Sequence, residues 1–370
     1  MRVIFRLAFF TILFYEATCL SSCKIVGTQL ENTDETVSYN IGFPVIRYKY
    51  FLNGGKEYVA FCDFVSNKKI AVHSIDGAQL FVTPFDKVME KENEKFYAFS
   101  IVNLDTFALL TKYTNKVFLI NRNGELIYKK DYSKYLLESK ELCSPMELDS
   151  GVLKVGISFM DINFPDNPTI EDYIESEKTG NFFPNLFIDS SFYKEPESIT
   201  FGLDSLYSRF VRADEMNTEG NYSLLLRNRV LFKSSYSDSF YVFNNHYELD
   251  TVVYVDSKFY DIDTRPVKIS DFLKNMNLIS ENFWEHGFIS NLLYDGRRNL
   301  YYCFVRGKMD GNMLPFSIIA YDKNFSKLDE VKMDYKAYYP YGFVGSKGLY
   351  VEKINKNEKN IKTFTIFSCR

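Results

Sequence analysis

Two stretches of the chain repeat the same order of strands and turns, and this repeat constrains the fold more than any other feature. Their Gly-containing turns, Asp76-Gly77 and Asn123-Gly124, lie 47 residues apart. Asp-Gly and Asn-Gly between apolar runs are strong hairpin signals, because both central residues of a type I′ turn need positive φ. The matching apolar runs are Tyr58–Phe61, Ile70–Ser74 and Gln79–Val82 in the first copy, and Phe107–Leu110, Val117–Ile120 and Leu126–Tyr128 in the second. The sequence therefore predicts repeated antiparallel meanders.

Weaker copies follow, beginning near Ser223, Leu292 and Gly348. The chain holds 28 Tyr and 35 Phe, and aromatic side chains favour strands over helices. A repeat of this length with about four strands per copy is typical of propeller blades, so we predict an all-β fold, a β-propeller. The alternative is a β-sandwich or a stack of unrelated hairpins. A sandwich of this length would need two domains and a linker, and no Pro/Gly/Ser-rich linker is present.

The chain length would accommodate about seven repeats, but insertions near residues 155–200 and 257–290 take up part of it. We therefore expect six blades, with seven as the alternative. Short helical insertions are predicted between blades at Thr169–Lys178, Ser270–Lys274 and Ser280–Trp284. An N-terminal strand at Thr36–Ile41 is expected to pair with the last blade and close the ring, which removes exposed sheet edges.

The N-terminus has the pattern of an export signal. Arg2 and Arg6 precede a short apolar run, Leu7–Tyr15, which is too brief to cross a bilayer. Leu20-Ser21-Ser22-Cys23 then resembles the bacterial lipobox, in which the cysteine receives the lipid. We predict a lipoprotein signal peptide over residues 1–22 and a single propeller domain over residues 23–370, attached to a membrane through Cys23. The alternative is an ordinary secretory signal in which Cys23 is incidental.

The charge balance bears on partners and location. There are 44 basic and 48 acidic residues, a net charge of −4, so neither a nucleic-acid footprint nor a polybasic membrane patch is expected. Lys24–Gly27 carries no acidic cluster of the kind that resembles a surface-export signal. We therefore expect a lipoprotein of the bacterial outer membrane that faces the periplasm.

Four cysteines remain after the predicted cleavage: Cys62, Cys143, Cys303 and Cys369. In an oxidising compartment they could form disulfides, with three possible pairings. However, Cys62 and Cys303 lie within apolar strand-like runs, where a free cysteine behaves as a small buried hydrophobic residue. We expect free thiols.

The lipobox, the aromatic-rich blades and the phrase from Leu293-Tyr294-Asp295 to Tyr301-Tyr302 together resemble the TolB-like six-bladed β-propeller lipoproteins of Bacteroidetes, an uncharacterised family. The resemblance spans the mature chain and rests on pattern. It implies a fold and an envelope location. It implies no activity and no catalytic residues.

Candidate ligand-binding residues are few. Trp284 is the sole tryptophan and lies beside His286, one of three histidines, in an irregular segment, while Asp295 lies in a predicted hairpin turn. His73 and His246 are expected to be packing and turn residues. The acidic stretch that begins at Asp161 resembles the start of a calcium loop but lacks the required Gly and Glu, so a solvated helix face is the better interpretation.

No catalytic residues, metal site or cofactor site are predicted. We expect a non-enzymatic binding or scaffolding propeller with a protein or glycan partner. The alternative is a hydrolase or lyase acting on glycans, with carboxylates such as Asp295 and Asp161 converging at the rim. A purely structural lipoprotein of an envelope complex is the third hypothesis.

Overall fold

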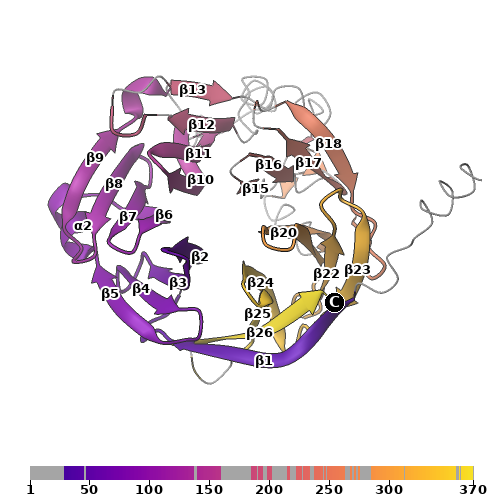
Figure 1. Cartoon of the computed structure of the whole chain (residues 1–370). Helices are drawn as coiled ribbons and strands as arrows, with labels where there is room; N and C mark the ends of the chain where they lie inside the picture. The colour runs from indigo at the N-terminus through magenta and orange to yellow at the C-terminus, as the bar shows by residue number, and fades with distance from the viewer. Residues whose placement is uncertain are drawn as a thin grey trace, which may run out of the picture.

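The computed structural model describes residues 29–45, 47–136, 140–159, 185–189, 191–194, 198–201, 215–216, 222–226, 228–233, 237–244, 246, 248–262, 267–268, 271, 274–275, 285–311, 313–355, 358 and 360–369. These residues form six four-stranded antiparallel sheets arranged as blades around a central axis (Figure 1). The fold is an all-β six-bladed β-propeller, as the repeat predicted.

In blades 1 to 5 the strands run in chain order from the axis outward, and blade 6 differs in its outer strand (Figure 1). Blade 1 is β2 (Arg47–Asn53), β3 (Lys56–Asp63), β4 (Lys69–Ser74) and β5 (Gln79–Pro84). Blade 2 is β6 (Phe96–Asn103), β7 (Thr106–Thr111), β8 (Lys116–Asn121) and β9 (Leu126–Asp131). Blade 3 is β10 (Lys140–Asp149), β11 (Val152–Phe159), β12 (Asn185–Asp189) and β13 (Ser198–Phe201).

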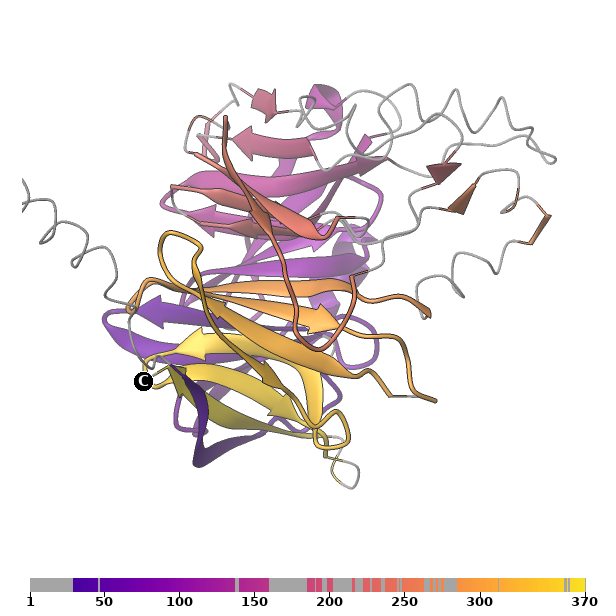
Figure 2. The same ribbon diagram turned by 90° about the vertical axis from the view of Figure 1, so that its right-hand side faces the viewer.

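The second half of the ring repeats the arrangement. Blade 4 is β15 (Tyr222–Leu225), β16 (Val230–Lys233), β17 (Ser239–Phe243) and β18 (Leu249–Tyr254). Blade 5 is β20 (Phe288–Asp295), β21 (Leu300–Arg306), β22 (Phe316–Tyr321) and β23 (Lys327–Lys332). Blade 6 is β24 (Tyr338–Gly345), β25 (Gly348–Lys353), β26 (Ile361–Cys369) and, as its outer strand, β1 (Leu30–Asn40). A two-stranded sheet of β14 (Glu215–Met216) and β19 (Val267–Lys268) lies to one side of the ring (Figure 2).

The core is divided into clusters that lie between neighbouring blades. In β8, Phe118 and Ile120 pack towards blade 1, whereas Val117 and Leu119 pack towards blade 3. Successive side chains of a strand point to opposite faces of its sheet, so a strand covered on both faces favours apolar residues at successive positions. The middle strands are accordingly mostly apolar, with occasional buried polar residues such as His73 in β4.

The ring is closed by β1, which pairs antiparallel with β26 at the other end of the chain (Figure 1). The register runs from Thr36 opposite Thr365 to Asn40 opposite Ile361, which confirms the predicted closure. At its other end, the Leu30 backbone N–H donates to the Asp329 carboxylate in blade 5 (2.8 Å). The N-terminal strand therefore connects the last blade to both of its neighbours, since Tyr39 packs in the cluster shared with blade 1.

Two expectations about the inserted segments need correction. Residues 155–200 are not simply an insertion, because they include the end of β11, all of β12 and most of β13, which belong to blade 3. These strands were missed because the connection between β11 and β12 is long, so the antiparallel pair is not adjacent in sequence. The structure also contains a helix that was not predicted, α2 (Asp86–Glu92), between blades 1 and 2, which buries Val88 and Met89 against the core.

The predicted helices at Thr169–Lys178 and Ser280–Trp284 lie outside the described residues. In the remaining predicted helix, Ser270–Lys274, the described residues Asp271 and Lys274 are helical. The Asn275 N–H donates to the Asp271 carbonyl (3.1 Å), as in a helical turn. A 3₁₀ turn follows β9 at Ser133–Tyr135. No helix among the described residues has both the length and the apolar character needed to span a bilayer.

Closure of the ring predicts a large stability contribution from Tyr39. Its ring is fully buried against Phe61 and His73, and its hydroxyl donates to the Ile75 carbonyl (2.9 Å). Tyr39→Ala should lower the free energy of unfolding by about 3–5 kcal/mol, because it leaves a cavity in the closing strand. Tyr39→Phe should cost about 1 kcal/mol, the hydrogen bond alone. Urea denaturation measures both values.

The matched control is Tyr254→Ala on the outer strand β18, where the side chain is 64% exposed. It should change the free energy of unfolding by less than about 0.5 kcal/mol. Equal losses for Tyr39→Ala and Tyr254→Ala would contradict the role assigned to the closing strand.

The central channel as candidate functional site

The innermost strand of every blade contributes to one cavity along the propeller axis, with a volume of about 1090 Å³. One lining residue from each blade, in chain order, is Tyr48, Phe99, Met146, Leu225, Asn291 and Tyr341. The innermost strand of blade 1 keeps its side chains partly exposed to this cavity. Every residue of β2 is half-buried or exposed, whereas six of the eight residues of β3 are buried.

The innermost strands run in the same direction, so the channel has two different mouths. Arg47 and Lys49 of β2 contact Ser144 and Met146 of β10 in parallel order. We call the end where these strands begin the N-terminal mouth. The other end, where each innermost strand turns back into the next, is the hairpin mouth.

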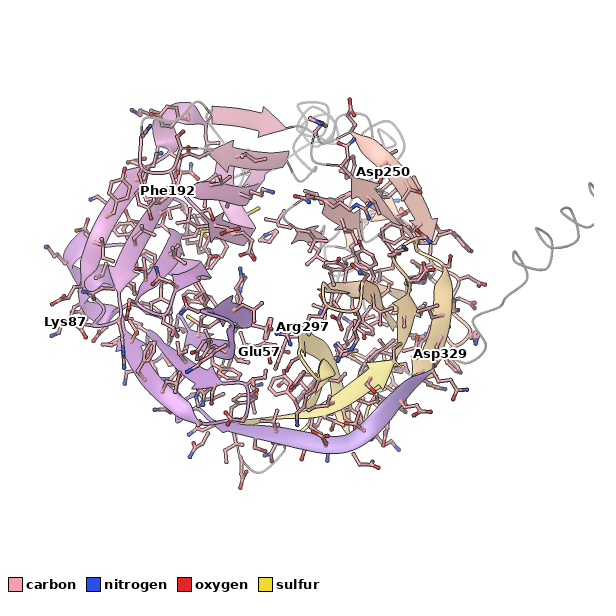
Figure 3. All side chains as sticks on the ribbon, in the orientation of Figure 1. Glu57, Lys87, Phe192, Asp250, Arg297 and Asp329 are labelled. Carbon is pink, nitrogen blue, oxygen red and sulfur yellow. The ribbon has the colours of Figure 1, made fainter. Side chains whose placement is uncertain are left out.

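A polar network joins three blades at the hairpin mouth. The Glu57 carboxylate accepts hydrogen bonds from the Tyr50 hydroxyl (2.6 Å) and the Ser346 backbone N–H (2.7 Å), and forms an ion pair with Arg297 (3.2 Å). Figure 3 shows Glu57 and Arg297 together at the inner edge of the ring. Burial alone would raise the pKa of Glu57, but the hydrogen bonds from Ser346 and Tyr50 and the charge of Arg297 outweigh it. The pKa therefore lies below its ordinary value of 4.5.

The other carboxylates of the channel wall also have partners. Glu147 pairs with Lys49 (2.6 Å), and Glu352 pairs with Lys362. Asp295 is 1% exposed and accepts from the guanidinium of Arg298 (2.8 Å) and from the backbone N–H groups of Arg297 and Arg298. Among the described lining residues, no carboxylate is left without a basic or backbone donor.

Arg47 at the N-terminal mouth differs from the other cations of the wall. Its guanidinium donates one hydrogen bond to the Ser144 hydroxyl (2.9 Å) and lies 5.9 Å from the Tyr97 ring centroid. Lys49, Arg297 and Lys362 each have a carboxylate partner, but Arg47 has none within the described part of the chain. The lining residues therefore carry one positive charge that is not neutralised by an ion pair.

Aromatic rings gather on the wall formed by blades 1 and 6. Tyr339 and Tyr341 of β24 are 40% and 53% exposed. Phe343 of the same strand also lines the channel, and it stacks on Tyr50 and on Tyr350. Burial raises the pKa of Tyr48 well above 10, and the nearby Glu352 carboxylate raises it further, so this phenol stays neutral. The wall formed by blade 4 is aliphatic, with Leu224, Leu225 and Leu226.

A second hollow of about 590 Å³ lies outside the ring at β9, beside the segment that contains Phe192 (Figure 3). Its most buried cation, Lys130, is already bonded to the Asp189 carboxylate and to the carbonyls of Phe192 (2.8 Å) and Lys194 (2.7 Å). The Tyr132 hydroxyl also donates to Asp189 (2.7 Å). This cluster holds the end of β12 against β9, which is a structural role.

The predicted site residues are distributed over the molecule. Cys23 and Trp284 lie outside the described residues, as does Asp161. His286 is half-buried just before β20, whereas Asp295 ends the same strand. The eight residues of β20 rise about 3.3 Å each along the strand, so His286 before its start and Asp295 at its end lie at opposite mouths of the channel. Asp295 lines the channel but holds its hairpin turn, and whether either residue binds a ligand stays a prediction.

The other predictions of residue roles can be checked directly. His73 is buried between Tyr39 and Phe61, and His246 lies in a turn with its backbone N–H bonded to Asn244, as expected. Cys62, Cys143, Cys303 and Cys369 form no disulfide in the described part of the chain. No group of residues with metal-binding geometry occurs among the described residues.

The sequence reasoning missed Arg47, Tyr339 and Tyr341. The available signal was the run Arg47–Tyr50, in which basic residues alternate with tyrosines in a strand that precedes the apolar strand of a repeat. That position in the repeat identifies an innermost strand, whose side chains face the axis.

Comparisons with known proteins support the fold. No protein-family model matches the chain, and no curated protein gives a significant match. Among solved structures, a member of the DUF4221 family from Bacteroides vulgatus is similar over 92% of this chain and 98% of its own, with a TM-score of 0.68 and 17% identity. A "Putative exported protein" from Bacteroides fragilis is similar over 92% of this chain and 97% of its own, with a TM-score of 0.50 and 13% identity. At these identities the likeness shows the propeller fold alone.

The network at the hairpin mouth predicts a pH-dependent contribution to stability. Because the pKa of Glu57 is lowered in the folded protein, its contribution is fully present above the unfolded value near 4.5 and is lost as the pH falls through the folded value. Glu57→Gln should lower the free energy of unfolding by about 1–3 kcal/mol at neutral pH. The difference from wild type should shrink as the pH falls below about 4.5. Urea denaturation over a series of pH values measures it.

Glu31→Gln, on the exposed face of β1, removes the same charge outside the network and is the control. A Glu57→Gln deficit that stays constant down to acidic pH would show that the carboxylate charge does not stabilise this mouth.

Proposed function

We propose that this chain is an exported protein, anchored at the bacterial cell envelope through Cys23, that binds a ligand in its central channel without transforming it. The observation that carries the proposal is the channel itself. It combines a volume of about 1090 Å³ with exposed tyrosine side chains, an aliphatic wall and a cation, Arg47, that has no carboxylate partner among the described residues. Concave sites with apolar and aromatic walls and a few placed polar groups are typical of ligand binding.

The state of the carboxylates argues for binding over glycan cleavage. A hydrolase needs two acids about 5–9.5 Å apart, one of which must be able to give or take a proton. In the described wall, Glu147, Glu352 and Asp295 are each engaged by a basic side chain. Each of these three carboxylates already has a partner within the wall, so none is presented to a ligand as an unengaged acid. The hydrolase or lyase alternative, with Asp295 and Asp161, has no observation in its favour.

Export and anchoring are supported by the N-terminal sequence. Two arginines, a short apolar run and the lipobox-like Leu20–Cys23 precede β1, which begins at Leu30. The likeness to a "Putative exported protein" agrees with this location. The periplasmic orientation and a protein or glycan partner remain predictions from the sequence alone.

A substitution at Cys23 tests the anchor. With the wild-type chain expressed in a Gram-negative host, a lipidated protein should partition into the membrane fraction and incorporate labelled palmitate. Cys23→Ala should abolish both, because the acceptor sulfur is gone, while Cys19→Ala should leave both unchanged. Membrane association that survives Cys23→Ala would contradict the lipid anchor.

Channel binding is tested with a neutral fluorescent probe, phenylnaphthylamine, whose emission rises in apolar surroundings. The protein is the chain from residue 24 on, which contains every described strand. Asn291→Trp puts a large ring into the channel from β20 and should weaken binding of the probe about tenfold or more, since the ring takes up part of the cavity.

The matched control is Gln79→Trp, an amide-to-Trp change at an exposed position of the outer strand β5. It should leave the affinity unchanged, and circular dichroism should show that both variants are folded. Equal affinities in wild type and Asn291→Trp would contradict binding in the channel.

A further inference from the structure

The chemistry of the N-terminal mouth narrows the class of ligand. We propose, on the basis of the channel-binding function above, that the channel binds a small organic monoanion with a flat apolar ring, whose acidic group contacts Arg47 and whose ring lies on the tyrosines of β24.

The charges of the wall indicate a single negative group on the ligand. Lys49 and Lys362 are neutralised by Glu147 and Glu352, and Arg297 is shared with Glu57. Arg47 is the remaining lining cation of the described residues, and one of its hydrogen bonds goes to the Ser144 hydroxyl. A guanidinium has five N–H donors in a planar fork that fits the paired oxygens of an acid. The single positive charge of Arg47 matches a ligand with one negative charge. A second negative charge on the ligand would find no cation to pair with among the described lining residues.

Contacts with Ser144 and Tyr97 hold the Arg47 guanidinium in place. Its hydroxyl accepts from one terminal nitrogen of Arg47 (2.9 Å), and the Tyr97 ring lies beside the same group. These contacts come from β10 and β6, so they hold the arginine against the wall of blades 2 and 3. A guanidinium that is held in place loses less conformational entropy when it binds an anion.

The flat ring of the proposed ligand is inferred from two tyrosines of blade 6 that line the same channel. Tyr339 and Tyr341 both line the channel, in the part of β24 where its register against β25 shifts between Tyr338 and Gly342. With 40% and 53% of their surfaces exposed, both side chains are accessible to a ligand in the channel. Stacking between flat rings and contact with the leucines of β15 both favour an apolar body over a fully hydrated one.

The test uses two probes that share one ring system. Anilinonaphthalene sulfonate carries a single negative charge, and phenylnaphthylamine is the same aromatic body without the sulfonate. Wild type should bind the sulfonate more tightly than the neutral probe. Arg47→Gln should weaken the sulfonate about tenfold or more, because charge-assisted hydrogen bonds are lost, and should change the affinity for the neutral probe by less than about twofold.

Arg122→Gln is the matched control, since it removes the same charge from an exposed turn outside the channel, where Arg122 lies over the Phe81 ring. It should leave both affinities unchanged. Arg47→Lys keeps the charge without the planar fork and should restore part of the affinity for the sulfonate. If Arg47→Gln does not fold, Arg47→Lys serves as the test variant. Compared with wild type, Arg47→Lys should then bind the sulfonate more weakly and the neutral probe equally well.

The outcomes separate this proposal from the function on which it rests. If Arg47→Gln affects both probes alike or neither, while Asn291→Trp weakens both, channel binding stands and the anion site at Arg47 is overturned. If Asn291→Trp affects neither probe, the proposed function fails as well. A selective loss of sulfonate binding in Arg47→Gln, absent in Arg122→Gln, supports the proposal.

Discussion

The pairing of the first strand with the last is the interaction on which the rest of the structure depends. Without β1, the outer edge of β26 would be unpaired and the cluster between blades 6 and 1 would lose Tyr39 and Val37. A ring of blades encloses a channel only while every blade is packed between two neighbours. The closing strand therefore determines both the stability of the propeller and the shape of the channel wall.

Closure of the ring also explains why charged and aromatic side chains gather around the axis. Strands in the middle of a blade are covered on both faces and are mostly apolar, as in β8 and β21. The innermost strands line the channel, and accessible side chains such as those of β2 can be charged or aromatic there without disturbing the clusters between blades. The hairpin mouth is an example, because three blades meet there through Glu57, Arg297 and the backbone of Ser346. These residues are far apart in sequence.

The sequence predicted the fold because the repeat is local. Asp76-Gly77 and Asn123-Gly124 mark their turns without reference to distant residues, and the closing strand followed from the need to remove sheet edges. The strands of blade 3 were missed because the partners β11 and β12 are separated by a long connection. The channel residues were missed for a related reason, since Arg47 and Tyr341 belong to different ends of the chain and only closure brings them to one cavity. Asp295 was identified from its turn, and the structure shows it holding that turn.

The most direct test of the account is a crystal structure of the protein grown with anilinonaphthalene sulfonate. The account predicts electron density for the ring system inside the channel, against Tyr339 and Tyr341, with sulfonate oxygens within hydrogen-bond distance of the Arg47 guanidinium. Density at an outer surface with an empty channel would contradict the claim that the channel is the binding site of this protein.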